Sequence, residues 1–439
     1  MEMMRSAAMA PLPEPEGPVA LEKIVATFGK IGLLSFGGPA AQIALMHRVL
    51  VEERRWLDER RFLSALSFCM LLPGPEAMQL ATYAGWRMRG VSGGLIAGLL
   101  FVLPGAALVL MLAMLYGAYG TTPAVTALFV GVKAAVLAIV LQALVRVAAR
   151  AIQGWLDWTA AAAGFIAIFF LGLPFPLVIA AAAAAGFFLR ATDAPTGDFA
   201  RLERVPLSQT LRTLAVWLAV WLAPLFAIAA LFGTGHVLAQ LAYFFSKLAV
   251  LTFGGAYAVL AYMAQEAVTG YGWLTAGEML DGLGLAETTN GPLILVTEFV
   301  GYIAGLHAGG VWIALMGALV ALWATFAPCF LWIFAGAPYI ERLTHAPRLA
   351  AALRAVTAAV VGVIANLSVW FALHVIFTRV DVRQAGPLRL HVPDLPSVDP
   401  VALTLTVLAL VLIFALRWGI VATLALCAAA SLAWLGMAA

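Results

Sequence analysis

Glycine and proline residues interrupt the apolar segments of this chain at four places, and these interruptions are where we expect its chemistry. They lie at 37–39, 73–75, 254–255 and 290–292. Three of them contain a Gly-Pro step, which suits the start of a helix because glycine permits unusual backbone angles and proline fits the first turn. A helix N-terminus offers free N–H groups and about half a positive charge. Several such termini that converge would bind an anion.

Polar side chains next to the interruptions favour the same chemistry. Ser35 precedes the first interruption, Thr252 precedes the third, and Asn290 lies in the fourth, so each places a hydrogen-bond donor there. Lys30 and Lys247 each lie five residues before the hydroxyl residue, within apolar sequence. A charge inside a membrane segment is costly unless it is paired or functional, although a lysine can also extend to the membrane surface. The pattern predicts two lysines that neutralise a divalent anion.

An acidic residue follows the second interruption. We interpret Glu76 as a partner of a lysine, as a proton carrier, or as a simple cap of the helix that begins at Pro75. Glu287 and Glu298 could likewise pair with a lysine or carry a proton. The predicted substrate-binding residues are Lys30, Ser35, Gly37, Gly38, Pro39, Gly74, Pro75, Glu76, Lys247, Thr252, Gly254, Gly255, Asn290 and Gly291. The sequence contains no phosphate-binding loop, metal-ligand cluster or nucleophile triad, so it predicts no catalytic residue, metal or cofactor.

The four interruptions belong to two copies of one pattern. Residues 35–38 read Ser-Phe-Gly-Gly, and residues 252–255, which follow at a separation of 217, read Thr-Phe-Gly-Gly. Further pairs at that separation, or at 224 later in the chain, are Trp56 and Trp273, Gly74 and Gly291, Pro104 and Pro328, and Ala134 and Ala358. Chance matches would not keep one separation and then another in order. The sequence therefore predicts a duplicated unit of roughly two hundred residues.

The composition is that of a membrane protein. Of 439 residues, 64% are hydrophobic and 11% are charged, whereas a soluble domain carries about a quarter charged residues. Apolar runs of about 20 residues, which are long enough to cross a lipid bilayer as helices, recur along the chain. These runs are continuous and do not alternate, which argues against a β-barrel. The fold predicted is an all-α polytopic membrane protein, and the net charge of +3 gives no sign of nucleic-acid binding.

The chain divides into four predicted parts. These are a disordered N-terminal tail at 1–18, a first transporter repeat at 19–190, a linker with a connecting transmembrane helix at 191–235, and a second repeat at 236–439. Each repeat is expected to contain a broken element, a re-entrant hairpin (62–89 and 275–306) and then spanning helices. The spanning helices are predicted at 91–118, 123–148, 155–172, 174–190, 309–338, 348–378, 400–416 and 418–437.

Basic residues predict that the two repeats have opposite orientations. Short loops rich in Lys and Arg remain cytoplasmic. In the first repeat the basic stretches are 48–61, 87–89, 146–150 and 190–212. The segment equivalent to the first of these, 264–278, has no Lys or Arg, and the basic residues of the second repeat are Arg342, Arg348, Arg354 and Arg417. Only the loop at 379–399 fits poorly. Broken helices at matching positions of inverted repeats are typical of the central site of secondary transporters.

At these residues the sequence resembles the chromate ion transporter family, most clearly from Leu21 to Phe377. The stretches that carry the resemblance are 28–40, 72–75, 252–255 and 289–292, and the size resembles the long, two-domain branch. The likeness implies chromate efflux across the inner (plasma) membrane, and hence chromate resistance, with sulfate as a competing or related oxyanion. The second copy departs from the first, because Ala256 replaces Pro39 and Thr289 replaces Pro73.

Taken together, the sequence predicts a secondary transporter that exports chromate and is not an enzyme. The anion would lie near the middle of the membrane between the two repeats, held by backbone N–H groups at the interruptions. One alternative is a transporter of sulfate or another oxyanion, and alternatives from another class are an anion channel and an intramembrane enzyme. The prediction also allows for a homodimer.

Overall fold

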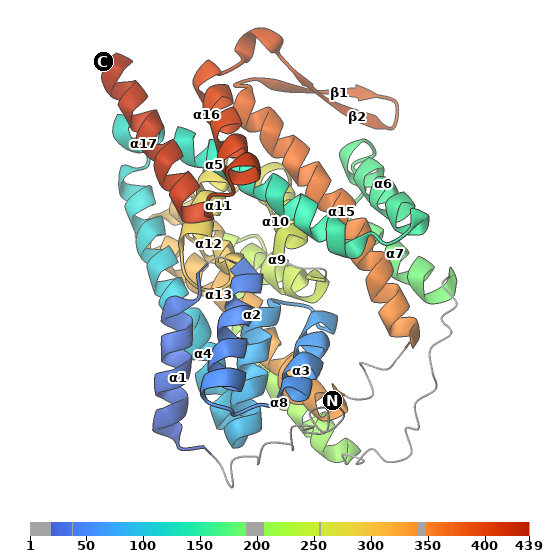
Figure 1. Ribbon diagram of the computed structural model, residues 1–439. Helices are drawn as coiled ribbons and strands as arrows, with labels where there is room; N and C mark the ends of the chain where they lie inside the picture. Colours follow the sequence, from blue (N-terminus) through green and yellow to red (C-terminus); the bar gives the residue numbers. More distant parts are fainter. Residues whose placement is uncertain (1–18, 37, 190–205, 254–255, 341–346, 439) are drawn as a thin grey trace, which may run out of the picture.

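The computed structural model describes residues 19–36, 38–189, 206–253, 256–340 and 347–438 (Figure 1). The predicted disordered tail and most of the linker lie outside these residues. Within them the chain is almost entirely helical, and six helices are long and apolar enough to cross a membrane. They are Glu76–Tyr119, Pro123–Ala151, Leu207–Phe232, Val311–Tyr339, Arg348–Ile376 and Ile420–Met437. The predicted all-α polytopic membrane fold is confirmed.

The first helices of the chain stop and restart at the predicted interruptions. They are α1 (Leu21–Leu34), α2 (Gly38–His47), a π-helical turn (Arg48–Glu53), α3 (Glu59–Leu71) and α4 (Glu76–Tyr119). Inside α4 the backbone of Arg89 and Gly90 is not helical, so two helices meet there end to end. The re-entrant hairpin predicted at 62–89 ends at this point.

Two helices are shorter than the sequence predicted. After α5 (Pro123–Ala151) come α6 (Trp155–Phe169) and α7 (Phe175–Leu189), which have 15 residues each. At 1.5 Å per residue such a helix covers about 22 Å, against a hydrocarbon thickness of about 30 Å. The helices found at the spans predicted at 155–172 and 174–190 are therefore shorter than the hydrocarbon layer, so the two spans stay a prediction. The connecting helix α8 (Leu207–Phe232) is long enough to span.

The second half of the chain repeats this order. Its elements are α9 (Val237–Leu251), α10 (Ala256–Gln265), a π-helical turn (Glu266–Gly270), α11 (Ala276–Thr288), a 3-10 turn (Leu293–Leu295), α12 (Val296–Gly309), α13 (Val311–Gly336), a 3-10 turn (Ala337–Tyr339), α15 (Pro347–Ile376), α16 (Pro400–Leu410), a π-helical turn (Val411–Ala415) and α17 (Ile420–Ala438). Both ends of α11 lie 217 residues after the ends of α3, and a π-helical turn follows both α2 and α10.

The segment at 379–399, expected to be a loop, contains a β-hairpin. Strands β1 (Val380–Ala385) and β2 (Leu388–Pro393) pair antiparallel at the top of Figure 1, and a 3-10 turn (Leu395–Ser397) follows. The hairpin is tied to the helices because the N–H of Arg389 donates to the carbonyl of Phe170, at 2.6 Å. It is the only strand pair in the described ranges.

Small residues allow the long helices to pack closely. At Gly94 and Gly98 of α4, a Cβ would overlap the rings of Phe334 and Phe330 on α13. Close approach of this kind is the usual basis of helix association in membranes, where apolar contact alone gives little preference. The packing brings α4 of the first half against α13 of the second, and α5 crosses α15 above them (Figure 1).

Candidate functional site

The four interruptions meet in two pairs, and each pair joins the two halves of the chain. The N–H of Gly74 donates to the carbonyl of Thr252 at 3.0 Å, and the N–H of Gly291 donates to the carbonyl of Ser35 at 2.9 Å. The first interruption of each copy is thus bonded to the second interruption of the other copy. We call these contacts the 74–252 pair and the 35–291 pair.

The two pairs have the same backbone geometry. Ser35 has φ −78° and ψ 67°, and Thr252 has φ −76° and ψ 71°. Each hydroxyl donates at 2.6 Å to the carbonyl four residues earlier, on Ile31 and Leu248 respectively. A hydroxyl has one proton to donate, so in this conformation neither side chain offers a donor to an anion. Both hydroxyls instead satisfy carbonyls near the ends of their helices.

The 35–291 pair is filled by amide side chains. The Nε2 of Gln42 donates to the carbonyl of Gly291 at 2.6 Å, and the Nδ2 of Asn290 donates to the carbonyl of Gly32 at 3.1 Å. Gln42, Asn290 and Ser35 are buried. At Gly105 of α4 a Cβ would overlap the carbonyl of Asn290. Asn290 and Gly291, both predicted ligands, therefore serve here to seal the packing between the two halves.

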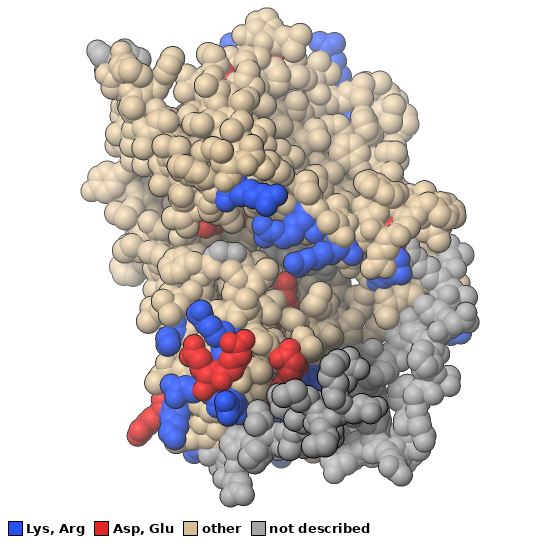
Figure 2. Space-filling view, viewed as in Figure 1, with Lys and Arg blue, Asp and Glu red and all other residues tan. Residues whose placement is uncertain are grey.

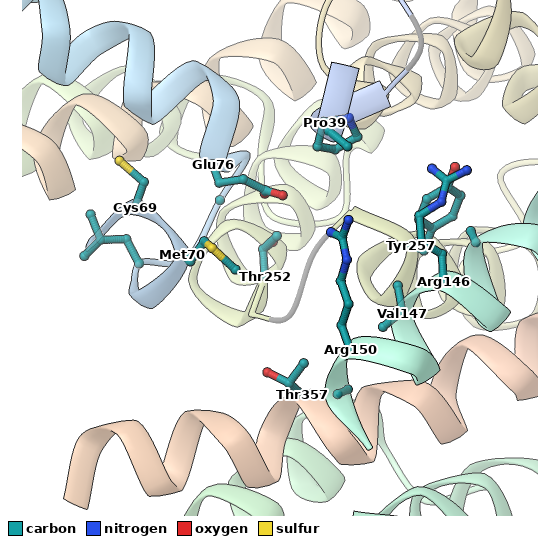
Figure 3. Close-up of a pocket in the computed structure, with 15 residues that line it drawn as sticks. Pro39, Cys69, Met70, Glu76, Arg146, Val147, Arg150, Thr252, Tyr257 and Thr357 are labelled. Atoms are coloured by element: carbon teal, nitrogen blue, oxygen red, sulfur yellow. The ribbon is translucent and has the colours of Figure 1, made fainter. Parts of the chain in front are cut away.

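The 74–252 pair borders a cavity of about 300 Å³ (Figure 3). The cavity lies where the start of α2 and the 72–76 interruption face α5, α10 and α15. Its lining residues are Pro39, Ala40, Cys69, Met70, Leu72, Gly74, Glu76, Ala143, Arg146, Val147, Arg150, Ala151, Thr252, Tyr257 and Thr357. Four of them, Pro39, Gly74, Glu76 and Thr252, are residues that the sequence predicted.

Two arginines give this cavity a positive wall. Arg146 and Arg150 lie four residues apart near the end of α5, so they follow one another along one face of the helix. Arg146 donates to the Oε1 of Gln142 at 3.1 Å, and Arg150 has no carboxylate partner among the described residues. Figure 2 shows a row of Lys and Arg side chains across the middle of this face, along the edge of a hollow. Guanidinium groups suit oxyanions because they donate two parallel hydrogen bonds.

An acidic side chain faces these arginines. Glu76 is the first residue of α4, and in Figure 3 its carboxylate and the guanidinium of Arg150 extend toward the same space from opposite walls. On the far side of the cavity, the hydroxyl of Tyr257 donates to the Oε1 of Glu287 at 2.9 Å. The predicted lysine partner of Glu287 is thus absent from the described contacts, and a tyrosine takes its place.

Several predicted ligands lie elsewhere. Lys30 has 58% of its side chain exposed and lies 4.0 Å from Glu53. The ammonium of Lys247 lies over the ring of Tyr262, at 5.6 Å from its centroid. Neither lysine lines the cavity, and neither do Gly38 and Pro75. Gly37, Gly254 and Gly255 lie outside the described residues.

Arg146 and Arg150 line the cavity but are not among the residues that the sequence predicts to bind substrate. In the sequence, residues 146–150 form a basic stretch that predicts the orientation of the first repeat. Two arginines four residues apart at the end of an apolar helix could also have been interpreted as a binding face. Thr357 and Tyr257 carried no signal, because single polar residues in apolar helices have many structural roles.

Comparisons with known proteins agree with a multi-pass protein of the plasma membrane. The family model "Chromate transporter" matches residues 22–187 and 239–433. The chain therefore belongs to the chromate transporter family.

Among its relatives are the chromate transport protein of Pseudomonas aeruginosa, 34% identical over 79% of this chain and 80% of the relative, and that of Cupriavidus metallidurans, 32% identical over 78% and 80%. A probable chromate transport protein of Synechococcus elongatus is 31% identical over 79% of this chain and 83% of its own. No solved structure matches the chain.

Proposed function

We propose that the protein is a secondary transporter that exports chromate and so confers chromate resistance, and that the cavity beside the 74–252 pair binds the anion. The observation that carries the proposal is the pair Arg146 and Arg150 on a wall that faces an interrupted helix. Two guanidinium charges match a divalent oxyanion. Arg150, without a carboxylate partner among the described residues, needs no rearrangement to receive one.

The surroundings of the arginines support an anion in this place. Pro39 lies in the first turn of α2 and Glu76 in the first turn of α4, and both line the cavity. The N-terminal ends of two helices therefore border the cavity with their partial positive charge. At about 300 Å³ the cavity is at the small end of ligand pockets, which suits a tetrahedral ion with some of its water.

Glu76 sets a limit on binding in this proposal. Its carboxylate shares the space with the arginines, so it competes with the anion for them. Glu76 would then lower the affinity of the cavity for the anion and favour release of the anion. Its predicted interpretations as a proton carrier or a cap are compatible with this position.

We also propose that residues 19–190 and 236–439 are two repeats of opposite orientation that rock against each other. The reciprocal bonding of the 74–252 and 35–291 pairs supports this, because exchange of the two copies turns one pair into the other. The distribution of Lys and Arg along the chain supports it as well. A transporter of this kind would expose the anion to each side of the membrane in turn.

Chromate flux into everted membrane vesicles tests the proposal. Vesicles that contain the protein should accumulate radiolabelled chromate saturably, and collapse of the proton gradient should show whether that gradient drives it. Excess sulfate should inhibit if the site accepts tetrahedral dianions in general. Accumulation no greater than in vesicles without the protein would contradict the proposal. Accumulation of sulfate but not chromate would identify the alternative substrate.

A further inference from the structure

A buried charge cluster lies away from the cavity, between α4, α5 and α11. The Nζ of Lys133 on α5 lies 3.2 Å from the Oδ1 of Asp281 on α11. The hydroxyl of Tyr116 on α4 donates to the Oδ2 of the same carboxylate at 2.8 Å. The side chain of Asp281 is 7% exposed and that of Lys133 is 23% exposed. Charges at such depth are costly and usually mark a function or a necessary pairing.

The repeat relates this cluster to the cavity. Lys133 and Thr357 are separated by 224 residues, the same separation that relates the residues after them, Ala134 and Ala358. Thr357 lines the cavity. Exchange of the two copies would therefore place Lys133 where Thr357 borders the cavity. The cluster marks the counterpart of the cavity.

The counterparts of the two cavity arginines carry no fixed charge. At the same separation, Arg146 corresponds to Trp370 and Arg150 corresponds to His374. The ring centroids of Trp370 and His374 lie 4.2 Å apart, and the Nδ1 of His374 lies 2.8 Å from the carbonyl of Trp370. These rings are occupied with each other. Of the three counterpart positions compared, only Lys133 carries a permanent cation.

The counterpart region is closed where the cavity is open. On the cavity side, Cys69 of α3 and Thr357 of α15 both line the empty space. On the counterpart side, α11 packs directly on α5, because a Cβ at Gly284 would overlap Val132. A Cβ at Gly277 would lie 3.4 Å from the Nζ of Lys133. Asp281 thus reaches Lys133 because no cavity separates the two helices.

The other charged groups nearby belong to α11 and α12. Glu278 lies three residues before Asp281, and its Oε1 lies 3.2 Å from the Nε2 of His307. The Nδ1 of His307 lies 3.0 Å from the carbonyl of Trp273. Glu278 is therefore engaged toward the start of α11, and Asp281 is the carboxylate left to pair with Lys133.

We propose that Lys133 is a second ligand for the transported oxyanion, and that Asp281 takes the place of the anion while α11 is closed on α5. An ammonium binds a carboxylate and an oxyanion through the same charge-assisted hydrogen bonds, and the Tyr116 hydroxyl can donate to either. When α11 moves away from α5, Lys133 loses its carboxylate and becomes available to the anion. This inference rests on the proposed function.

Single variants distinguish a ligand from a simple ion pair. Lys133→Met should reduce chromate flux in everted vesicles at least tenfold, and Lys133→Arg, which keeps the cation, should retain most of it. Asp281→Asn should keep at least a third of the flux and lower the KM for chromate several-fold, because the internal competitor is gone. Equal loss of flux in Lys133→Met and Asp281→Asn would overturn the proposal, since a structural pair loses as much from either side.

The exchanged pair gives an independent test. Lys133→Asp combined with Asp281→Lys restores an ion pair between α5 and α11, so the thermal stability of the purified protein should recover relative to Lys133→Met. Flux should remain below a tenth of the wild type, because the cation has moved to α11. Recovery of flux together with stability would overturn the proposal. Absence of chromate flux in the wild type would instead overturn the proposed function, and with it this inference.

Discussion

The 74–252 and 35–291 pairs share one backbone geometry but have opposite surroundings. Each joins two interrupted helices through a single N–H to carbonyl bond, at 3.0 and 2.9 Å respectively. The first borders a cavity with two arginines, whereas the second is sealed by Gln42 and by the contact between Asn290 and Gly105. The interruptions thus have the same geometry in both halves, whereas the side chains around them leave a basic cavity beside the 74–252 pair and close packing around the 35–291 pair.

Under the proposed function, this difference gives a duplicated chain a way to work as a carrier. If both pairs opened onto basic cavities at once, an anion path would run through the protein. In the described conformation the 74–252 pair borders a cavity. The counterpart region is packed, and there Lys133 is paired with Asp281. Alternation between two such states requires only that one pair gains space while the other loses it.

The largest expected effect comes from the arginine wall. Arg150→Ala should lower chromate flux more than tenfold, because it removes the guanidinium that has no other described partner, and Arg150→Lys should recover only part of it. Flux in everted vesicles, normalised to protein content, measures this. Arg48→Ala is the matched control, because Arg48 lies outside the cavity. Its side chain is 62% exposed, and its Nε lies 3.7 Å from the Oε1 of Glu53. If Arg150→Ala transports as the control does, the open pair is not the binding site.

A second prediction uses the two glycines that make the paired bonds. Gly74 has φ +121° and Gly291 has φ +91°, backbone angles that residues with a side chain rarely adopt. In addition, a Cβ at Gly74 would lie 2.8 Å from the Nε2 of Gln79. Alanine at either position should therefore destabilise the protein by about 1–3 kcal/mol. Thermal unfolding of the purified variants measures the loss.

Transport should separate the two glycine variants. Gly74→Ala also distorts the wall of the cavity, so its flux per folded molecule should fall several-fold. Gly291→Ala lies in the sealed pair and leaves the wall of the cavity unchanged, so its flux per folded molecule should fall less than that of Gly74→Ala. Equal effects on flux would show that the two pairs contribute alike, contrary to the comparison.

The helix interruptions were largely predictable from the sequence, whereas the arginine-lined cavity was not. Glycine and proline mark an interruption in the local sequence, so the helix ends near Leu34 and Leu251 could be predicted without a structure. The bond between Gly74 and Thr252 could not, because it depends on how helices from both halves pack. Arg146 and Arg150 resembled a cytoplasmic charge signal, since the same residue type serves orientation and ligand binding.

A third and smaller effect should come from the acid opposite the arginines. Glu76→Gln keeps the shape of the side chain and removes its charge, so chromate should meet less competition for Arg150. We expect the KM for chromate to fall several-fold while the maximal rate changes little or decreases because release slows. Initial rates over a range of chromate concentrations measure both. A raised KM would mean that Glu76 supports the anion and does not compete with it.

The smallest effect is expected at Lys30, and there the sequence and the structure disagree. The sequence predicts that Lys30→Ala abolishes transport, because a lysine in an apolar segment should be functional. In the structure its side chain is 58% exposed, with Glu53 at 4.0 Å, and such surface pairs contribute about 0–1 kcal/mol. We therefore expect flux within about twofold of the wild type, with unchanged thermal stability. Loss of transport in a correctly inserted Lys30→Ala protein would mean that Lys30 reaches the anion in the other conformation. The lysine would then belong to the transport cycle although it lies outside the open cavity.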